Sequence, residues 1–327
     1  MTSAPPPLEV SHLTTAFHLK AGTVRSVNDV SFTLHRGEML GMVGESGSGK
    51  SVTGLSILRL IEPPGRIMGG SIRVKGQEIT SLPEGAFRRL RGRVVSMIFQ
   101  DPMTTLNPVL TIGRQFYDVM RAQERISRPD AMERAEEALR QVGIPSPRAR
   151  LHAYPHQLSG GMRQRVCIAI ALISDPEIVI ADEPTTALDV TIQAQILSLV
   201  QNLARQRSMA MIWVTHDLSV VAGLCDRVAV MYAGRIVEMG RTDDVLNRPL
   251  HPYTLGLINS IPAEASPAER LKQIPGSPPS PLQLPPGCAF APRCERATTA
   301  CTAVPEEREI GTGHTVRCFH PVGASPL

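Results

Sequence analysis

The stretch Met39-Leu40-Gly41-Met42-Val43-Gly44-Glu45-Ser46-Gly47-Ser48-Gly49-Lys50-Ser51 decides the fold. Its first five residues are an apolar run that predicts a buried strand, and residues 51–61 predict a helix that Pro63 and Pro64 end. Between the two elements, residues 44–51 fit the pattern G-x-x-x-x-G-K-S. Glycine lets backbone N–H groups turn inward around a phosphate, and the helix N-terminus adds partial positive charge.

This strand–loop–helix unit predicts a nucleotide phosphate site. Lys50 is expected to reach the β- and γ-phosphates, and the Ser51 hydroxyl is expected to bind Mg²⁺. The rest of the loop is expected to hold ATP chiefly through its backbone: Gly44, Glu45, Ser46, Gly47, Ser48 and Gly49. The alternative is a chance glycine-rich turn, against which the flanking strand and helix argue.

Two carboxylates follow a second apolar run, residues 178–181. Asp182 would lie near the metal ion, and Glu183 would lie near the water that attacks the γ-phosphate. Acidic residues after a buried strand are common in α/β proteins, so the pair gains its meaning from the phosphate loop.

The composition is that of a soluble globular protein. Of the 327 residues, 42% are hydrophobic and 20% charged, and the net charge of +4 comes from 34 basic and 30 acidic residues. This balance, with only 4% aromatic residues, argues against a nucleic-acid partner. The longest apolar run, residues 166–173, predicts a buried helix segment, and no signal peptide is visible, so the chain is expected in the cytoplasm.

Strands alternate with helices along the first 250 residues, which predicts an α/β domain with a largely parallel sheet. Further strands are expected near 27–34, 71–74, 94–99 and 209–214, helices near 129–142 and 190–205, and a hairpin at 228–239. Residues 100–174 are helical in character, and after about residue 250 prolines such as Pro275, Pro278 and Pro279 predict an extended segment.

The octet Leu158-Ser159-Gly160-Gly161-Met162-Arg163-Gln164-Arg165 is a second glycine-containing turn before an expected helix. It resembles the signature motif of the ABC ATPase family. The resemblance implies a P-loop NTPase (RecA-like) core with an antiparallel β subdomain and a helical subdomain at about 101–174. It also implies that two ATPase domains pair head to tail, so that one chain's signature closes on ATP bound by the other.

Other family motifs follow in order, and the resemblance implies their roles. Gln100 is similar to the glutamine that contacts Mg²⁺ or the attacking water, and His216 to the histidine that contacts the γ-phosphate. Residues expected to serve the partner's ATP are Ser159, Gly160, Gly161 and Gln164, with Asp189 of the Ala187-Leu188-Asp189 segment. Glu183 is expected to act as general base, with Gln100 and His216 beside it as catalytic groups. Phe17 is either the aromatic that stacks on adenine or a core residue.

The tail resembles the C-terminal extension of the oligopeptide and dipeptide importers. Its matching stretches are His251-Pro252-Tyr253-Thr254, Ile274-Pro275-Gly276-Ser277-Pro278-Pro279 and Pro292-Arg293-Cys294, and residues 101–108 also match that branch. We therefore expect an ATPase domain at 1–250 and a proline-rich, cysteine-containing extension at 251–327. Import of nickel, glutathione or oligosaccharides, or a non-transport ABC ATPase, are the alternatives.

The tail also contains four cysteines: Cys288, Cys294, Cys301 and Cys318. Their spacing lacks the short knuckles typical of zinc sites, and four thiolates suit a [4Fe–4S] cluster, which the resemblance to the peptide branch also suggests. A cluster, Zn²⁺ and unligated thiols all stay open. His314 and His320 nearby are expected at the surface, and Cys167 and Cys225 in the core.

The resemblance further implies partners and a location. They are a second ABC ATPase subunit (a different chain sooner than a copy), two membrane-spanning permeases and, indirectly, an extracytoplasmic peptide-binding protein. The permeases would contact the helical subdomain near residues 104–108. The chain is then expected to be peripheral, on the cytoplasmic face of the inner membrane. A rival interpretation is a regulatory or metal-sensing module with vestigial hydrolysis, against which intact Glu183 and His216 argue.

Overall fold

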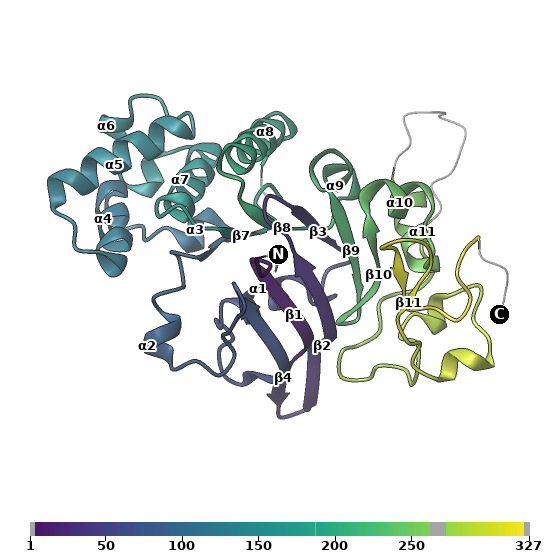
Figure 1. The fold of residues 1–327 in the computed structure, drawn as a ribbon. Coiled ribbons are helices and arrows are strands. Elements are labelled where there is room, and N and C mark those ends of the chain that lie inside the picture. The colour runs from purple at the N-terminus through teal and green to yellow at the C-terminus, as the bar shows by residue number, and fades with distance from the viewer. Residues whose placement is uncertain (1–3, 187, 262–272, 324–327) are drawn as a thin grey trace. The chain divides into compact units, whose positions relative to one another are not determined.

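In the computed structural model, residues 4–186, 188–261 and 273–323 are described, and they form two compact units (Figure 1). The first unit comprises the described residues of Met1–Leu34, Glu38–Thr80 and Trp213–Leu327. The second comprises His35–Gly37 and the described residues of Ser81–Ile212. The division passes through strand β8 (Ala210–Thr215), whose last three residues belong to the first unit.

One sheet of the first unit is antiparallel, with the order β2-β1-β4-β5. Its strands are β1 (Leu8–Leu19), β2 (Gly22–Leu34), β4 (Gly65–Val74) and β5 (Gln77–Glu78), and β1 pairs with both β2 and β4 (Figure 1). The apolar side chains of β2 that suggested a strand, from Val27 to Leu34, are buried. The predicted antiparallel β subdomain is confirmed.

The other strands of the first unit include β3 (Met39–Val43), which is completely buried. β3 pairs in parallel with β9 (Arg227–Tyr232), which forms the predicted hairpin with β10 (Arg235–Arg241). The extension adds β12 (Thr315–Val316) to the edge of β10, and β11 (Arg308–Glu309) pairs with β12. The helices of this unit are α1 (Lys50–Ile57), α9 (Leu218–Leu224), α10 (Thr242–Asn247) and α11 (Pro252–Asn259), with short 3-10 turns at Ala291–Arg293 and Thr299–Thr302.

The second unit contains the parallel pair β6 (Val95–Ile98) and β7 (Ile178–Asp182), and most of its remaining chain is helical. The amphipathic helix α5 (Arg128–Gln141) begins with a Ser127 cap and buries Ala131, Ala135 and Leu139, which share one helical face. The other helices are α2 (Glu84–Phe87), α3 (Pro102–Thr105), α4 (Ile112–Gln123), α6 (Pro147–Arg150), α7 (Gly160–Leu172) and α8 (Val190–Arg207), with a 3-10 turn at Pro155–Gln157.

Helix α7 carries the longest apolar run, and the predicted buried segment is confirmed. Its Val166, Ile168 and Ala169 are at most 2% exposed, and Cys167 is buried beside them. Burial raises the pKa of the Cys167 thiol to about 12, as expected for a core cysteine. Among the described helices, none combines the length and the apolar character needed to cross a membrane.

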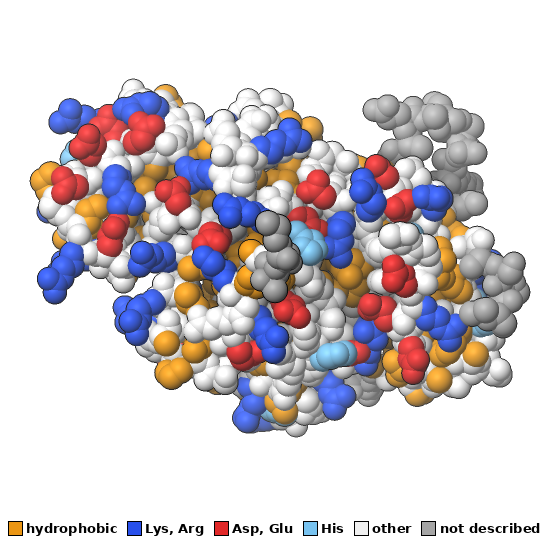
Figure 2. Space-filling view, in the orientation of Figure 1, with side chains coloured by type: hydrophobic (Ala, Val, Ile, Leu, Met, Phe, Trp, Pro, Cys, Tyr) orange, Lys and Arg blue, Asp and Glu red, His pale blue; other side chains and the backbone are white. Residues whose placement is uncertain are grey.

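The outer surface of α4–α6 carries both signs of charge. Figure 2 shows Lys and Arg side chains intermixed with Asp and Glu over these helices. Arg114 pairs with Asp118 at 2.9 Å and Arg140 with Glu136 at 3.1 Å, each one helical turn apart. Such exposed pairs contribute little to stability and are typical of a solvated face.

Candidate functional site

The phosphate loop, residues 44–51, has a backbone that only glycine permits at two positions. Gly44 and Gly49 have φ angles of 152° and 104°. A Cβ on Gly44 would lie 2.2 Å from the Met231 carbonyl oxygen, and one on Gly49 would lie 2.2 Å from the Ser26 carbonyl oxygen. The loop therefore packs directly against the backbone of β2 and β9, which fixes its position at the carboxyl end of β3.

Lys50, at the start of α1, is turned into this loop. The side chain is 4% exposed, and its Nζ donates to the carbonyl oxygens of Gly44 at 2.7 Å and Glu45 at 3.0 Å. The Ser48 N–H donates to the same Glu45 carbonyl at 3.2 Å, which closes the turn. A buried ammonium group held by a glycine-rich loop at the start of a helix is suited to binding a phosphate.

In the second unit, the structure brings Gln100 and Glu183 together. They follow β6 and β7, whose carboxyl ends are adjacent because the two strands are parallel. Gln100 Nε2 donates to Glu183 Oε2 at 3.4 Å, and Thr186 Oγ1 donates to the same oxygen at 2.9 Å. Glu183 has a φ of 42°, a left-handed conformation that is uncommon outside glycine and is found at functional sites. Asp182, at the end of β7, is 6% exposed.

The signature turn, residues 158–161, begins helix α7. Ser159 is the N-cap, and its Oγ accepts from the Met162 N–H at 3.3 Å. Ser159 and Gly160 are exposed, whereas Gln164 is 1% exposed and its amide nitrogen has no partner among the described residues. Asp189 caps α8 in the same way by accepting from Ile192, and Ala187 lies outside the described residues.

Two further predicted residues lie in the first unit with the phosphate loop. His216 follows β8 and is exposed. Phe17, on β1, is half-buried, and a Cβ on Gly65 of the neighbouring strand would lie 2.5 Å from its ring. The ring therefore rests on a glycine, an arrangement that fits a core residue as well as a stacking surface.

Sequence reasoning assigned no role to three residues that contact the phosphate loop or its neighbourhood. The Glu45 N–H donates to the Tyr253 hydroxyl at 2.8 Å, and the Glu45 carboxylate pairs with Arg293, which also donates to the Tyr232 hydroxyl at 3.3 Å. Tyr253 and Arg293 both lie in tail stretches that match the peptide-importer branch. The resemblance to the peptide-importer extension identified the positions of Tyr253 and Arg293, but nothing in the sequence indicated which residues they contact.

The four tail cysteines influence one another electrostatically. Burial raises the pKa values of Cys288, Cys294 and Cys318, and neighbouring thiols add to the effect; the pKa of Cys318 rises to about 11. Within the part of the chain that the structure describes, however, no group of three or more His, Cys, Asp or Glu side chains is arranged to hold a metal ion. The predicted metal site, with Cys288, Cys294, Cys301 and Cys318 as its ligands, is therefore not confirmed.

The prediction that His314 lies at the surface is wrong. This residue precedes β12 and is 7% exposed, and its Nε2 lies 2.8 Å from Glu238 Oε1 on β10. Glu238 is also buried and accepts from the N–H groups of Leu250 at 2.7 Å and His251 at 2.8 Å. His314 is buried because it satisfies this carboxylate, as buried polar groups require. His320 is half-buried, within 2.7 Å of Thr298 Oγ1.

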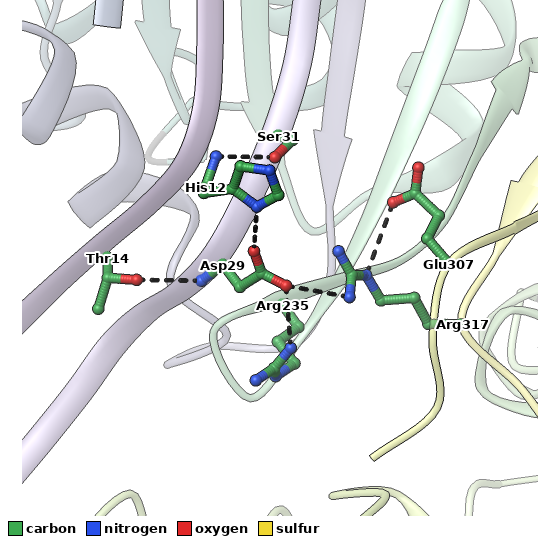
Figure 3. Close-up of polar contacts among 7 residues, drawn as sticks. All are labelled: His12, Thr14, Asp29, Ser31, Arg235, Glu307 and Arg317. Carbon is green, nitrogen blue, oxygen red and sulfur yellow. Dashed lines mark hydrogen bonds and ion pairs between the residues drawn. The ribbon is translucent and has the colours of Figure 1, made fainter. Parts of the chain in front are cut away.

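A second charged cluster connects the tail to the antiparallel sheet (Figure 3). Asp29 of β2 lies 2.7 Å from His12 Nδ1, 3.1 Å from Arg317 and 3.4 Å from Arg235. Burial alone would raise the pKa of Asp29, but the hydrogen bond from His12 and the two arginines outweigh it and lower that pKa. The extension is therefore fixed to the first unit both at Glu238 and at Asp29.

Two families match the sequence. Residues 27–186 match the ABC transporter family, and residues 237–301 match the family described as oligopeptide/dipeptide transporter, C-terminal region. Both the phosphate loop and the signature turn lie in the first match, and Tyr253 and Arg293 lie in the second.

Similar proteins extend the match to almost the whole chain. The oligopeptide transport ATP-binding protein OppD of Salmonella typhimurium is 49% identical, covering 98% of this chain and 97% of its own length. AppD of Bacillus subtilis, also an oligopeptide transport ATP-binding protein, is 49% identical, covering 95% and 96%. The dimeric structure of MJ0796, a bacterial ABC transporter cassette, has a TM-score of 0.64 at 25% identity, covering 72% of this chain and 98% of that one. The predicted P-loop NTPase fold is thus confirmed, and the chain belongs to the oligopeptide transport ATP-binding proteins of the ABC transporter family.

Proposed function

We propose that this chain hydrolyses ATP to drive the import of oligopeptides through a membrane transporter. The observation that carries the proposal is a 49% identity to oligopeptide transport ATP-binding proteins that includes the C-terminal extension. The buried Lys50 inside a closed phosphate loop supports ATP binding. Nickel, glutathione and oligosaccharides are the alternative cargoes, because an ATPase subunit need not contact what is transported.

In this proposal, residues 44–51 bind the ATP phosphates, and Phe17 stacks on the adenine. Ser51, Asp182 and Gln100 would hold Mg²⁺, since hydroxyl, carboxylate and amide oxygens are the ligands that this ion prefers. When bound, the ion offsets the negative charge of the phosphates.

Glu183 would act as the general base for the attacking water. Its carboxylate is held by Gln100 and Thr186, and this support can fix the direction in which the carboxylate points. His216 would stabilise charge on the transferred phosphoryl group. The partner's ATP would be contacted by Ser159, Gly160, Gly161, Gln164 and Asp189. The exposure of Ser159 and Gly160 supports that role, whereas Gln164 is buried and would act only through the helix start.

We place the permease contact at α3 and the residues after it. Met103, within α3, and Val109, four residues after its end, are 53% and 76% exposed, which is unusual for large apolar side chains. Two permeases, a second ATPase chain and an extracytoplasmic peptide-binding protein complete the proposed assembly. Peripheral attachment on the cytoplasmic side of the inner membrane follows from that assembly.

The tail cysteines carry a separate proposal, a [4Fe–4S] cluster, with Zn²⁺ as the alternative. It is supported by four free cysteines within residues 288–318, of which Cys301 is buried and the other three are half-buried. Anaerobically purified protein should then absorb visible light and contain iron. Colourless protein with one zinc per chain would favour the alternative, and metal-free protein would contradict both.

Transport assays in cells that lack this chain test the main proposal. Cells complemented with the natural protein should take up labelled oligopeptides, whereas Glu183→Gln should reduce uptake about a hundredfold or more while retaining ATP, because removing a water-orienting group costs several kcal/mol of barrier. Uptake of nickel or glutathione instead of peptide would reassign the cargo. Undiminished ATP turnover in Glu183→Gln would remove Glu183 from the mechanism.

A further inference from the structure

The second residue of the phosphate loop is held by the C-terminal extension at both its backbone and its side chain. The Glu45 N–H donates to the Tyr253 hydroxyl at 2.8 Å. The two oxygens of the Glu45 carboxylate accept from Arg293, from Nη1 at 2.8 Å and from Nη2 at 3.1 Å. Such a two-point pairing fixes the orientation of the carboxylate as well as its distance.

Arg293 is itself fixed on several sides. Its side chain is 5% exposed, Nε donates to the Pro275 carbonyl at 2.9 Å, and Nη1 also donates to the Tyr232 hydroxyl at 3.3 Å. The guanidinium lies over the rings of Tyr232 and Phe290, 5.9 Å from each centroid. Its hydrogen bonds to Glu45 raise the pKa of Arg293, so the group stays charged. Because the guanidinium of this ion pair is buried, removing the Glu45 carboxylate would leave a charge with little access to water.

The same glutamate determines where the loop's lysine lies. The Glu45 carbonyl oxygen accepts from Lys50 Nζ at 3.0 Å and from the Ser48 N–H at 3.2 Å. A shift of Glu45 therefore moves the ammonium group and the turn together. The extension also lines one wall of a cavity of about 280 Å³ with Pro278, Pro279 and Pro281, and Glu45 and Ser48 line it as well.

We propose that Arg293 is a positioning residue for the phosphate loop, through which the C-terminal extension sets the affinity of this chain for ATP. The inference rests on the proposed ATP binding at Lys50. Arg293 acts on the nucleotide only through Glu45, and Tyr253 holds the backbone of the same residue. The extension is then a structural part of the nucleotide site as well as a mark of the peptide-importer branch.

Equilibrium binding of ATP to the full chain tests this inference. Arg293→Ala should raise the Kd for ATP about tenfold, since small misplacements of a binding group have effects of that order or more. Arg293→Lys keeps the charge but loses the two-point pairing, so its Kd for ATP should lie between those of the natural chain and Arg293→Ala. Arg296→Ala is the matched control, because this arginine lies in the same segment and donates to the Pro321 carbonyl at 3.0 Å; its Kd should stay within about twofold of the natural value. Glu45→Gln should weaken binding similarly, and adding Arg293→Ala to it should cause little further loss.

A purely structural role would give a different result. Thermal unfolding without nucleotide would then show equal losses of melting temperature in Arg293→Ala and Arg296→Ala, and the Kd for ATP would be unchanged in both variants. That outcome overturns the inference. Fully additive effects of the Glu45 and Arg293 substitutions on the Kd also overturn it. If Arg293→Ala does not fold, Glu45→Gln and Arg293→Lys report on the same contact. If the natural chain itself binds no ATP, the proposed function fails. If it binds ATP and needs Lys50 but not Arg293, only the present inference fails.

Discussion

The phosphate loop and the signature turn are both glycine-containing turns at the start of a helix, yet they are built differently. In the phosphate loop, Ser48 and Lys50 are buried, and Gly44 and Gly49 touch backbone carbonyls. In the signature turn, Ser159 and Gly160 are exposed, and among the described residues a Cβ on Gly160 would find only Leu188, at 4.0 Å. One turn is enclosed by its own unit, whereas the other is exposed at Ser159 and Gly160 and enclosed only at Leu158 and at Gly161, where a Cβ would lie 2.8 Å from Ile192.

The largest expected effect is on the free energy of unfolding, and it contrasts Gly49 of the phosphate loop with Gly160 of the signature turn. Gly49→Ala should lower the free energy of unfolding by about 4 kcal/mol, because φ is 104° and the new Cβ would lie 2.2 Å from the Ser26 carbonyl oxygen. Gly160→Ala should change it by less than about 1 kcal/mol, and in the stabilising direction, since alanine favours a helix. Urea unfolding of both variants gives the comparison. Equal destabilisation would mean that the signature turn is as tightly enclosed as the loop.

The next effect distinguishes residues that bind the chain's own ATP from residues that would contact ATP bound by a partner. Lys50→Ala should raise the Kd for ATP of the isolated chain about a hundredfold, because it removes a charge-assisted contact to phosphate. Ser159→Ala should leave that Kd within about twofold and cost only about 1 kcal/mol of stability through the lost helix cap. Calorimetric titration with ATP measures both variants. A comparable loss of affinity in Ser159→Ala would assign the signature turn to the chain's own nucleotide.

The smallest effect is the pH dependence of the free energy of unfolding, which we attribute to His251 at the start of the extension. Burial lowers the pKa of His251 to about 4, and its Nδ1 accepts the Tyr253 N–H at 3.0 Å while neutral. The unfolded histidine takes up its proton near its ordinary pKa of 6.5, so the stabilisation from this group is complete above that pH. It should be lost as the pH falls toward 4, with about 2 kcal/mol of it gone by pH 5.

His251→Asn supplies the control, because asparagine can accept the same N–H without titrating. Unfolding measured between pH 7 and pH 4 should show a flatter stability profile for this variant than for the natural chain. Parallel profiles would show that other groups cause the loss of stability in acid.

The local elements could be predicted because their signals are local. Residues 39–51, the hairpin of β9 and β10, and helix α5 all carry turn residues, caps or an apolar face within a few positions. The predicted helix at residues 51–61 is too long, because α1 ends at Ile57. The N–H groups of Leu58 and Leu60 donate to carbonyls of the helix and form its final turn. The first of the prolines that suggested the end of the helix lies six residues after Ile57.

Long-range contacts could not be predicted in this way. His314 was expected at the surface because nothing near it in the sequence indicated a partner, and its partner Glu238 lies 76 residues away. The same is true of the pairing of Arg293 with Glu45. The motifs identified candidate residues for the chemistry, but the contacts that hold those residues depend on tertiary packing. The roles of Glu183, Ser159 and His216, and the division of the chain at about residue 250, stay predictions.

The ties between Glu45 and the extension also bear on how the protein is made. Tyr253 and Arg293 lie 208 and 248 residues beyond Glu45 in the chain. During synthesis from the N-terminus, the phosphate loop can acquire these contacts only after residue 293 has left the ribosome. If Arg293 positions the loop as proposed, a nascent chain can complete its nucleotide site only after residue 293 has emerged.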